Sequence, residues 1–224
     1  MEKQKIDTLI LSDFHLGNKS TRCFEVLNVL DRYKYDQLIL NGDIIDGLRF
    51  RRLHTEHWRI LSKIRKLSKN CEVIWIHGNH DAAANILSQL LGIKVRNKYI
   101  WEAGDKKFLA IHGHQYDRFL HDNLIISYFA FVFYYLIKRV DTTGYLVNYI
   151  KRHNGTWHRD SLEVAKGALR LGRNLGADYV FCGHTHLIYE TQNQGVKYYN
   201  TGSWTEKPSG YITIAGEKVV LNKI

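Results

Sequence analysis

The chain has 224 residues, 45% hydrophobic and 24% charged, which suits one globular domain with or without an insertion. These figures exclude a disordered chain and a collagen-like repeat, and the single proline, Pro208, excludes a Pro-rich linker. Its 32 basic and 22 acidic side chains give a formal net charge of +10. Such a balance favours an anionic partner, which could be a phosphate-bearing substrate, a nucleic acid or an anionic lipid surface. The alternative is that the charge serves solubility alone.

Expected strands and helices alternate along most of the chain. The apolar runs that predict strands, rich in Val, Ile, Leu, Tyr and Trp, are 7–12, 37–41, 72–77, 107–112 and 178–182. Apolar residues recur at helical spacing within 23–30, 60–67 and 164–175. Gly92 and Gly176 lie where helices would end. The alternation predicts an α/β sheet with helices on both faces.

The C-terminal part has a different pattern. Three short strands are expected in succession, at 197–200, 210–215 and 218–221. Because consecutive strands pair most simply as antiparallel neighbours, we expect a mixed sheet or a second sheet.

Residues 124–137 form an uncharged apolar segment of 14 residues. A helix that spans a bilayer needs about 20 residues, so this segment is too short to cross a membrane. It is apolar on all sides, which leaves two interpretations open. It is either a buried core helix or a cap helix that contacts lipid or acyl chains.

Cysteine usage indicates a reducing compartment. The three cysteines, Cys23, Cys71 and Cys182, are widely spaced and form no Cys-x-x-Cys pair of the zinc-binding type. We therefore expect reduced, mostly buried thiols in a cytoplasmic protein. The apolar run that ends at Asp13 is shorter than a signal peptide requires, so none is expected.

Polar side chains of the metal-ligand type occur at the carboxyl ends of five expected strands. The segments are Asp13-Phe14-His15, Gly42-Asp43-Ile44-Ile45-Asp46, Gly78-Asn79-His80-Asp81, His112-Gly113-His114 and Gly183-His184-Thr185-His186. In an open α/β sheet the carboxyl ends of the strands share one edge, and sites are built there. We therefore expect these five segments to meet in space.

Seven of these residues form a donor set without a thiolate: Asp13, His15, Asp43, Asn79, His112, His184 and His186. Imidazole nitrogens with carboxylate and amide oxygens suit Mn²⁺, and Fe or Zn²⁺ are alternatives. Seven ligands are too many for one ion but enough for two, if one carboxylate bridges them. His114 could replace His112 as a ligand, or it could contact the ligands without touching an ion.

The ordered patterns Asp-x-His, Gly-Asp-x-x-Asp, Gly-Asn-His-Asp, His-Gly and Gly-His-x-His resemble those of the calcineurin-like metallophosphoesterases over nearly the whole chain. The resemblance implies an α/β (α+β, four-layer) fold of two packed mixed β-sheets flanked by helices. It implies that Asp13, His15, Asp43 and His186 hold one ion, and that Asp43, Asn79, His112 and His184 hold the other, with Asp43 bridging. His80 would then donate a proton or hydrogen bond to the leaving oxygen, with Asp46 orienting His80.

Two such cations lower the pKa of a water that they share and neutralise charge during displacement at phosphorus. A metal-dependent hydrolase of phosphoester or diphosphate bonds is therefore the expected activity. A nuclease is ranked low because charge is the only nucleic-acid feature of the sequence. A non-catalytic scaffold is disfavoured because the ligand set is intact.

Within the superfamily, the chain resembles the UDP-2,3-diacylglucosamine pyrophosphatase group of lipid A synthesis. The resemblance rests on the basic stretch 47–52, the segment 198–204 and an apolar insertion, expected at 118–160 within a single domain 1–224. It implies a nucleotide-linked lipid substrate and an enzyme at the inner face of a membrane. The substrate-binding residues would be Arg49, Arg51, Arg52, His114, Phe131 and Phe133. The best-known members of the group carry Arg at the position of His80, and the His form occurs in a broader set of relatives. A phosphodiesterase or phosphomonoesterase of soluble substrates is the alternative.

Overall fold

Two β-sheets packed face to face form the centre of the chain, and a computed structural model describes residues 3–47, 50–117 and 155–224 of it. The first sheet has six strands: β2 (Thr8–Leu11), β4 (Gln37–Asn41), β5 (Glu72–Ile76), β6 (Val95–Arg96), β12 (Gly210–Ala215) and β13 (Lys218–Lys223). Their order is β13-β12-β2-β4-β5-β6. The strands from β2 to β6 are parallel, whereas β12 and β13 pair in antiparallel fashion.

The second sheet has five strands: β7 (Lys98–Ala103), β8 (Lys106–Ile111), β9 (Tyr179–Cys182), β10 (Ile188–Asn193) and β11 (Val196–Thr201). Their order is β10-β11-β9-β8-β7, with parallel pairing in the centre and an antiparallel strand at each edge. A separate parallel pair joins β1 (Gln4–Lys5) to β3 (Tyr33–Lys34). Both sheets are therefore mixed.

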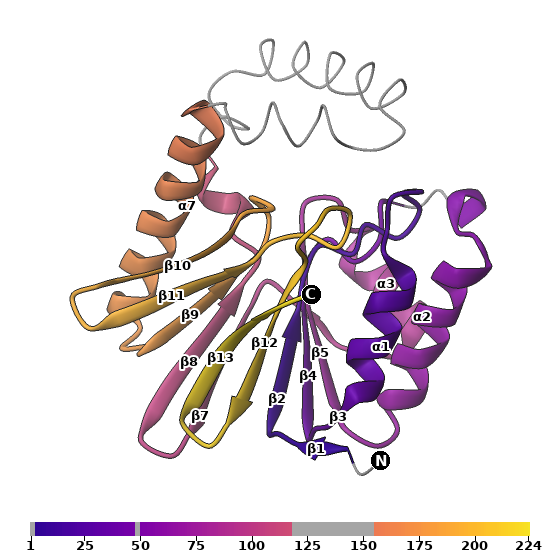
Figure 1. The fold of residues 1–224 in the computed structure, drawn as a ribbon, viewed down its shortest axis with the longest axis horizontal. Coiled ribbons are helices and arrows are strands. Elements are labelled where there is room, and N and C mark those ends of the chain that lie inside the picture. The colour runs from indigo at the N-terminus through magenta and orange to yellow at the C-terminus, as the bar shows by residue number, and fades with distance from the viewer. Residues whose placement is uncertain (1–2, 48–49, 118–154) are drawn as a thin grey trace.

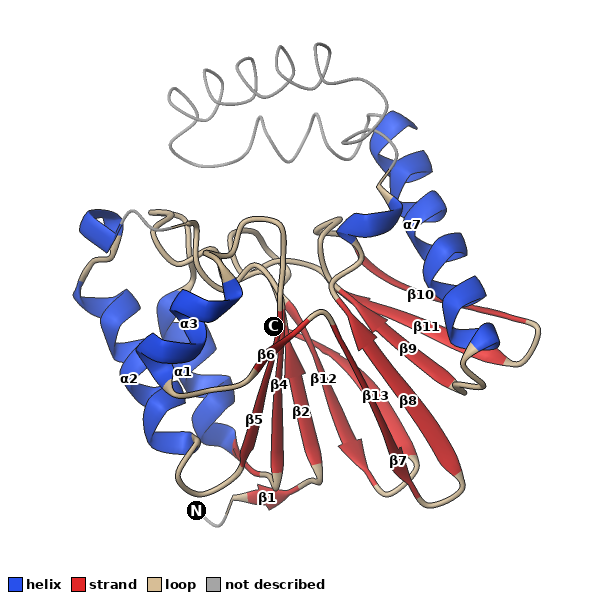
Figure 2. Cartoon of the chain, turned by 180° about the vertical axis from the view of Figure 1, so that it is seen from behind, coloured by secondary structure: helices blue, strands red, loops and turns tan. Residues whose placement is uncertain are grey.

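Helices cover the two outer faces of the paired sheets (Figures 1 and 2). The six-stranded sheet is covered by α1 (Cys23–Arg32), α2 (Thr55–Leu67) and α3 (Ala84–Leu91). The five-stranded sheet is covered by α7 (Gly155–Asn174). Two single-turn 3₁₀ helices, η1 (Phe50–Arg52) and η2 (His114–Tyr116), lie in the loops. The molecule thus has four layers, helix, sheet, sheet and helix, as the resemblance implied.

Alternating side chains of the central strands explain why these strands are apolar throughout. Leu9 and Leu11 of β2 pack toward α1 and α2, whereas Ile10 between them packs into the layer between the sheets. Leu38 and Ile39 of β4 divide in the same way. Because successive residues of a strand point to opposite faces, a sheet covered on both faces needs continuous apolar runs. The strands were predicted from these continuous apolar runs.

The structure confirms the predicted strands and adds five others, the two-residue strands β1, β3 and β6 and the longer edge strands β7 and β10. The sequence analysis did not predict β7 or β10, whose residues are largely exposed or half-buried. These edge strands are held by backbone pairing with β8 and β11, which leaves little apolar pattern in the sequence. Gly92 and Gly176, where helices were expected to end, adopt a left-handed conformation, with φ of 64° and 66°.

The expected insertion falls mainly outside the described residues, since only its last part, 155–160, is described, as the first turns of α7. Phe131, Phe133 and Arg49 also lie outside the described residues. Of the three cysteines, which form no disulfide, Cys182 is buried. The other two are half-buried. None of the described helices is both long and apolar enough to cross a membrane.

Candidate metal centre

The loops that follow β2, β4, β5, β8 and β9 bring together the polar side chains singled out in the sequence. Potential ligand atoms gather in three overlapping groups: Asp13, His15 and His186; Asp43, His112 and His184; and His15, Asp46 and His80. Within each group these atoms all lie within 4.8 Å of one another. Six of the seven expected ligands are therefore in such groups. The seventh, Asn79, is exposed on the same loop as His80.

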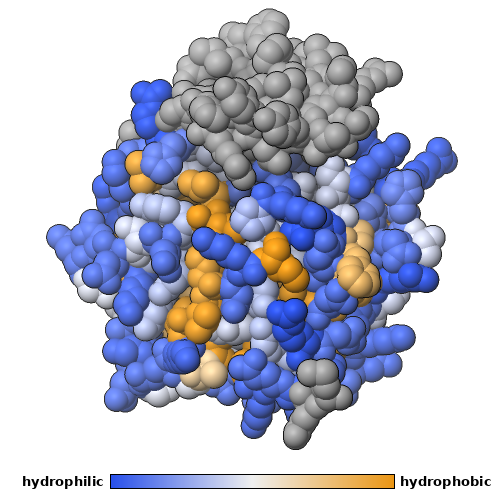
Figure 3. Space-filling view, viewed as in Figure 1, coloured by the Kyte–Doolittle hydropathy of each residue, from blue (hydrophilic) through white to orange (hydrophobic). Residues whose placement is uncertain are grey.

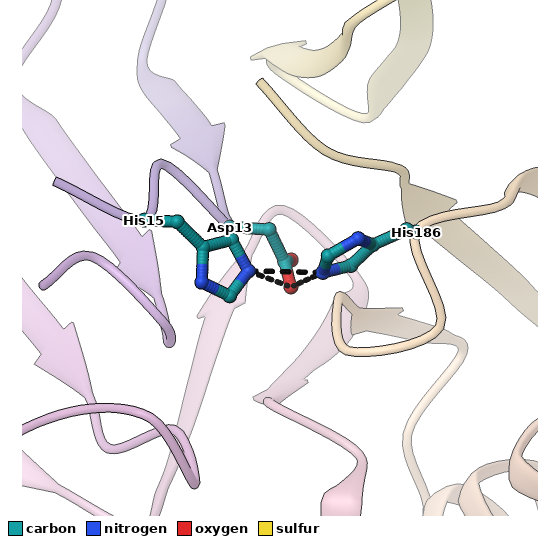
Figure 4. A group of neighbouring side chains, drawn as sticks. All are labelled: Asp13, His15 and His186. Carbon is teal, nitrogen blue, oxygen red and sulfur yellow. Dashed lines mark hydrogen bonds and ion pairs between the residues drawn. The ribbon is translucent and has the colours of Figure 1, made fainter. Parts of the chain in front are cut away.

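Asp13 and His15, from the loop after β2, converge with His186, from the distant loop after β9 (Figure 4). Nε2 of His186 lies 3.3 Å from Asp13 Oδ1, and Nε2 of His15 lies 3.9 Å from the same oxygen. The two imidazole nitrogens are 2.9 Å apart. Two ring nitrogens and a buried carboxylate oxygen that point at one another are typical of ligands around a cation.

Asp43 lies between the first two groups. Its Oδ2 atom is 3.2 Å from Nε2 of His112 and 3.8 Å from Nε2 of His15. His112 Nε2 is fully buried and makes no hydrogen bond within the described part of the chain. A buried polar nitrogen without a hydrogen bond is costly unless a ligand completes it. This nitrogen and the chemistry of the donor set fit divalent cations.

In His15 and His112, one ring nitrogen makes a hydrogen bond on the side away from the site. This bond determines which of the two nitrogens faces the site. Nδ1 of His15 donates to Asp46 Oδ1 at 2.7 Å, and Nδ1 of His112 donates to the backbone carbonyl of Asn41 at 3.0 Å. In both rings Nε2 is left for the site. Such outer partners fix the tautomer and the orientation of metal-binding histidines.

The two histidines of the 183–186 loop also have carboxylate neighbours. Nε2 of His184 donates to Asp117 Oδ2 at 2.8 Å, and Nδ1 of His186 lies 3.7 Å from Glu206 Oε1. Sequence reasoning missed both acids, because Asp117 follows a 3₁₀ turn and Glu206 lies in the loop before β12. The signal that could have found Asp117 is its place five residues after His112, next to the predicted strand end.

Asp46 lies closer to His15 than to the residue that it was expected to orient. Its Oδ1 atom is 3.5 Å from His80 Nδ1, against 2.7 Å from His15 Nδ1. The His80 side chain is half exposed. The hydrogen bond with Asp46 is the main cause that raises the pKa of His80. One carboxylate therefore contacts two imidazoles, and His80 keeps access to solvent.

Asp81 is a further residue that the sequence analysis did not single out, although it ends the Gly-Asn-His-Asp motif. Its Oδ1 accepts the backbone N–H groups of Ile44 and Ile45, at 2.9 and 3.1 Å. Its Oδ2 accepts those of Asp43 and Gly78 and the indole N–H of Trp75, at 2.9 to 3.0 Å. This buried carboxylate thus joins the loops after β4 and β5 and fixes the backbone that carries Asp43.

The backbone of the site is held in an uncommon conformation. Among the described residues other than glycine, six have positive φ, and five of them belong to the site: Asp13, His15, Asp43, His184 and His186, at 51° to 69°. Such backbone is unfavourable for residues with a side chain and persists where the surroundings impose it, commonly at functional sites. A Cβ on Gly78 would overlap Asp43, and one on Gly183 would overlap Asp13. Glycine at these two positions is required by close packing against the carboxylates.

The charges of the site favour a cation between the carboxylates. Burial alone would raise the pKa of Asp43, but the imidazoles of His112 and His15 outweigh it and hold that pKa well below its ordinary value. Burial opposes charge on His112 too, yet the carboxylates of Asp43 and Asp13 raise its pKa to about 10. The carboxylates of Asp43 and Asp13 therefore stabilise positive charge at a buried position.

The described residues expected to bind substrate lie around the same site. Burial is the main cause that lowers the pKa of His114 to about 4, and the neighbouring His112 and His184 lower it further. The ring of His114 is therefore neutral beside the second group of potential ligands.

Arg51 and Arg52 are exposed on η1. A Cβ on Gly17 would lie 3.6 Å from Cβ of Arg52 and 3.8 Å from Cβ of Asp46. The basic turn therefore borders the site. The face of the molecule drawn in Figure 3 is mostly hydrophilic, with a few apolar patches.

Comparisons with known proteins agree with this fold and show the family. The calcineurin-like phosphoesterase family matches residues 6–187. A novel archaeal phosphodiesterase of known structure is similar, with a TM-score of 0.52 and 14% identity over 97% of this chain and 99% of that one. Vps29 from Entamoeba histolytica, as a single mutant, has a TM-score of 0.50 and 15% identity over 97% of both chains. Vacuolar Protein Sorting 29 from Cryptosporidium parvum gives 0.50 and 17%, over 98% of this chain and 97% of that one.

No curated protein sequence matches the chain. At the identities above, the similar structures establish the fold alone. The family match covers most of the chain and includes all five segments that form the site. The chain therefore belongs to the calcineurin-like phosphoesterase family.

Proposed function

We propose that the protein hydrolyses phosphoester or diphosphate bonds with two divalent cations. Asp13, His15, Asp43 and His186 would hold one ion, and Asp43, Asn79, His112 and His184 would hold the other. The observation that carries the proposal is the position of Asp43, whose Oδ2 faces His15 in one group and His112 in the other. One buried carboxylate shared by two sets of imidazoles supports a bridging ligand.

When bound, the ions would supply Lewis-acid charge for the phosphate oxygens and a water of lowered pKa. The protein itself contributes a proton donor. His80 is half exposed at the edge of the site, and Asp46 holds its Nδ1 at 3.5 Å. A side chain placed in this way can donate a proton or a hydrogen bond to the leaving oxygen, which makes His80 the general acid of the proposal.

Purified protein is expected to hydrolyse an aryl phosphate ester or diester when Mn²⁺ is present. Chelation should abolish the activity and readdition of Mn²⁺ should restore it, because the buried carboxylates need cations to bind a phosphate. Phosphate or aryl alcohol release measures the reaction, and calorimetry measures the ions bound. Protein that binds no ions would contradict the proposal, and protein that binds two ions but hydrolyses no ester would be a scaffold instead.

Replacing His80 by alanine is expected to lower kcat by about 10²-fold or more with little change in KM, because the leaving oxygen loses its proton donor. Esters of phenols with low pKa should be less affected, since their leaving groups need no proton. His158→Ala is the matched control, because His158 is exposed on α7. An equal loss for good and poor leaving groups would remove His80 from the role of general acid.

We further propose that the substrate is a nucleotide-linked lipid diphosphate such as UDP-2,3-diacylglucosamine. The products would be a nucleoside monophosphate and a lipid phosphate, formed at the cytoplasmic face of a membrane. The basic turn at Arg51 and Arg52, which borders Asp46, supports a substrate with more than one phosphate. The uncharged segment 124–137 supports an acyl group in the substrate.

A comparison of substrates tests this assignment. Detergent-dispersed UDP-2,3-diacylglucosamine is expected to give a higher kcat/KM than an aryl phosphodiester, with products identified by mass spectrometry. Arg52→Ala should raise KM for the diphosphate about tenfold and leave the aryl ester little changed, since it removes a phosphate contact. Arg59→Ala is the control, because Arg59 pairs with Glu56 on α2. Preference for the soluble diester would instead support a phosphodiesterase of soluble substrates.

A further inference from the structure

Asp117 and His184 form a partly buried pair at the edge of the second group of potential ligands. Asp117 directly follows η2, the single turn that begins two residues after His112. Its Oδ2 is 2.8 Å from Nε2 of His184, and the two side chains are 16% and 8% exposed. We propose that Asp117 is a positioning residue that fixes the ring orientation and tautomer of His184. This inference rests on the proposed function, because the proposed function supplies the metal ion that His184 would bind.

The contact decides which nitrogen of His184 remains for the site. Since a carboxylate only accepts, Nε2 carries the proton and Nδ1 keeps the lone pair. His112 is held in the opposite sense, because its Nδ1 donates to the carbonyl of Asn41 and its Nε2 faces Asp43. The two rings are 5.3 Å apart and nearly perpendicular, at 71°. Two adjacent imidazoles therefore present different nitrogens, and an outer acceptor imposes each choice.

The backbone of the 183–186 loop is held by other residues. The indole N–H of Trp157, in the first turn of α7, donates to the carbonyl of Thr185 at 2.8 Å. On the other side, Nδ2 of Asn200 donates to the carbonyl of Gly183 at 2.6 Å. The N–H of His184 also donates to Asp13 at 3.0 Å. Loss of the Asp117 carboxylate should therefore disturb the ring of His184 rather than the path of the loop.

The amide of Asp117→Asn has the same shape as the carboxylate but can bond in either of two ways. Its oxygen can accept from Nε2, or its NH₂ can donate to Nε2 and shift the ring proton to Nδ1. The second arrangement removes the lone pair that the site needs. We expect the Mn²⁺ ion that His184 would hold to bind about 10- to 100-fold less tightly, the usual effect of losing an outer partner of a metal-binding histidine.

Mn²⁺ titration by calorimetry, followed by kcat at rising Mn²⁺, tests the proposal. Asp117→Asn should weaken one ion and recover most of its kcat when that ion is saturated. Asp117→Glu, which keeps a carboxylate on a longer side chain, should lie between Asp117→Asn and wild type. Asp160→Asn is the matched control, because it removes an acid near Asp117 on α7 and leaves the hydrogen bond between Asp117 and His184 in place. This control should bind Mn²⁺ as wild type does.

Three outcomes separate this inference from the proposed function. If wild-type protein binds no ions, the proposed function fails first. If wild type binds two ions and Asp117→Asn binds them with unchanged affinity, the positioning role alone is overturned. If Asp117→Asn lowers the melting temperature of metal-free protein by more than about 5 °C, which corresponds to about 1 kcal/mol or more, Asp117 is a structural residue and the proposal also fails.

Discussion

Replacing Asp81 by alanine is expected to lower the free energy of unfolding by about 4 kcal/mol or more, an unusually large effect for one substitution. The carboxylate accepts four backbone N–H groups and the indole N–H of Trp75 in a buried place. Without it these donors lose their acceptor, at about 1–3 kcal/mol each before any relaxation. Urea denaturation of metal-free protein measures the loss.

Asp81→Asn makes the prediction sharper, because the amide has nearly the same size as the carboxylate. Oδ1 faces two N–H donors and Oδ2 faces three, so the NH₂ group meets at least two donors in either orientation. We therefore expect Asp81→Asn to be destabilising by about 3 kcal/mol, although no cavity is created. Asp105→Ala is the control, because Asp105 is exposed in the turn before β8. A stable Asp81→Asn protein would mean that the loops after β4 and β5 keep their path without this carboxylate.

The strand ends could be predicted from sequence because two simple signals coincide there. Apolar runs mark the buried central strands, and the polar residues after them stand out against those runs. Parallel strands bring their carboxyl ends to one edge, which accounts for the meeting of Asp13 and Asp43 at the end of the six-stranded sheet. His112 follows a strand of the five-stranded sheet, so its contact with Asp43 also depends on the packing of the two sheets, which the order of strands along the chain does not give.

The partners behind the site could not be predicted in this way. Asn41 acts through its backbone carbonyl, which every residue type has. Asp117 and Glu206 come from a 3₁₀ turn and an irregular loop, where spacing carries no information about side-chain direction. Asp46 was expected beside His80, but its shorter contact is with His15, whose backbone has a positive φ in the loop after β2. These features depend on local backbone geometry that periodicity does not report.

Asp43→Asn is expected to have the largest effect on activity, a fall in kcat/KM of about 10³-fold or more. Asn is nearly isosteric and adopts positive φ readily, so the backbone at φ 54° should persist. The side-chain oxygen can still accept the N–H of His80, as Oδ1 does at 2.8 Å. The NH₂ then replaces Oδ2, and a donor that binds no cation faces His15 and His112.

Stability and activity should therefore separate in Asp43→Asn. Metal-free protein should remain folded although it loses up to about 3 kcal/mol of stability, because the buried imidazole of His112 loses its carboxylate partner. Calorimetry should find fewer than two Mn²⁺ ions, and loss of the shared carboxylate charge alone accounts for several kcal/mol of transition-state stabilisation. Asp105→Asn should leave both measurements unchanged. If Asp43→Asn kept two tightly bound ions and hydrolysis within tenfold of wild type, Asp43 would not bridge them, and the two groups of ligands would work independently.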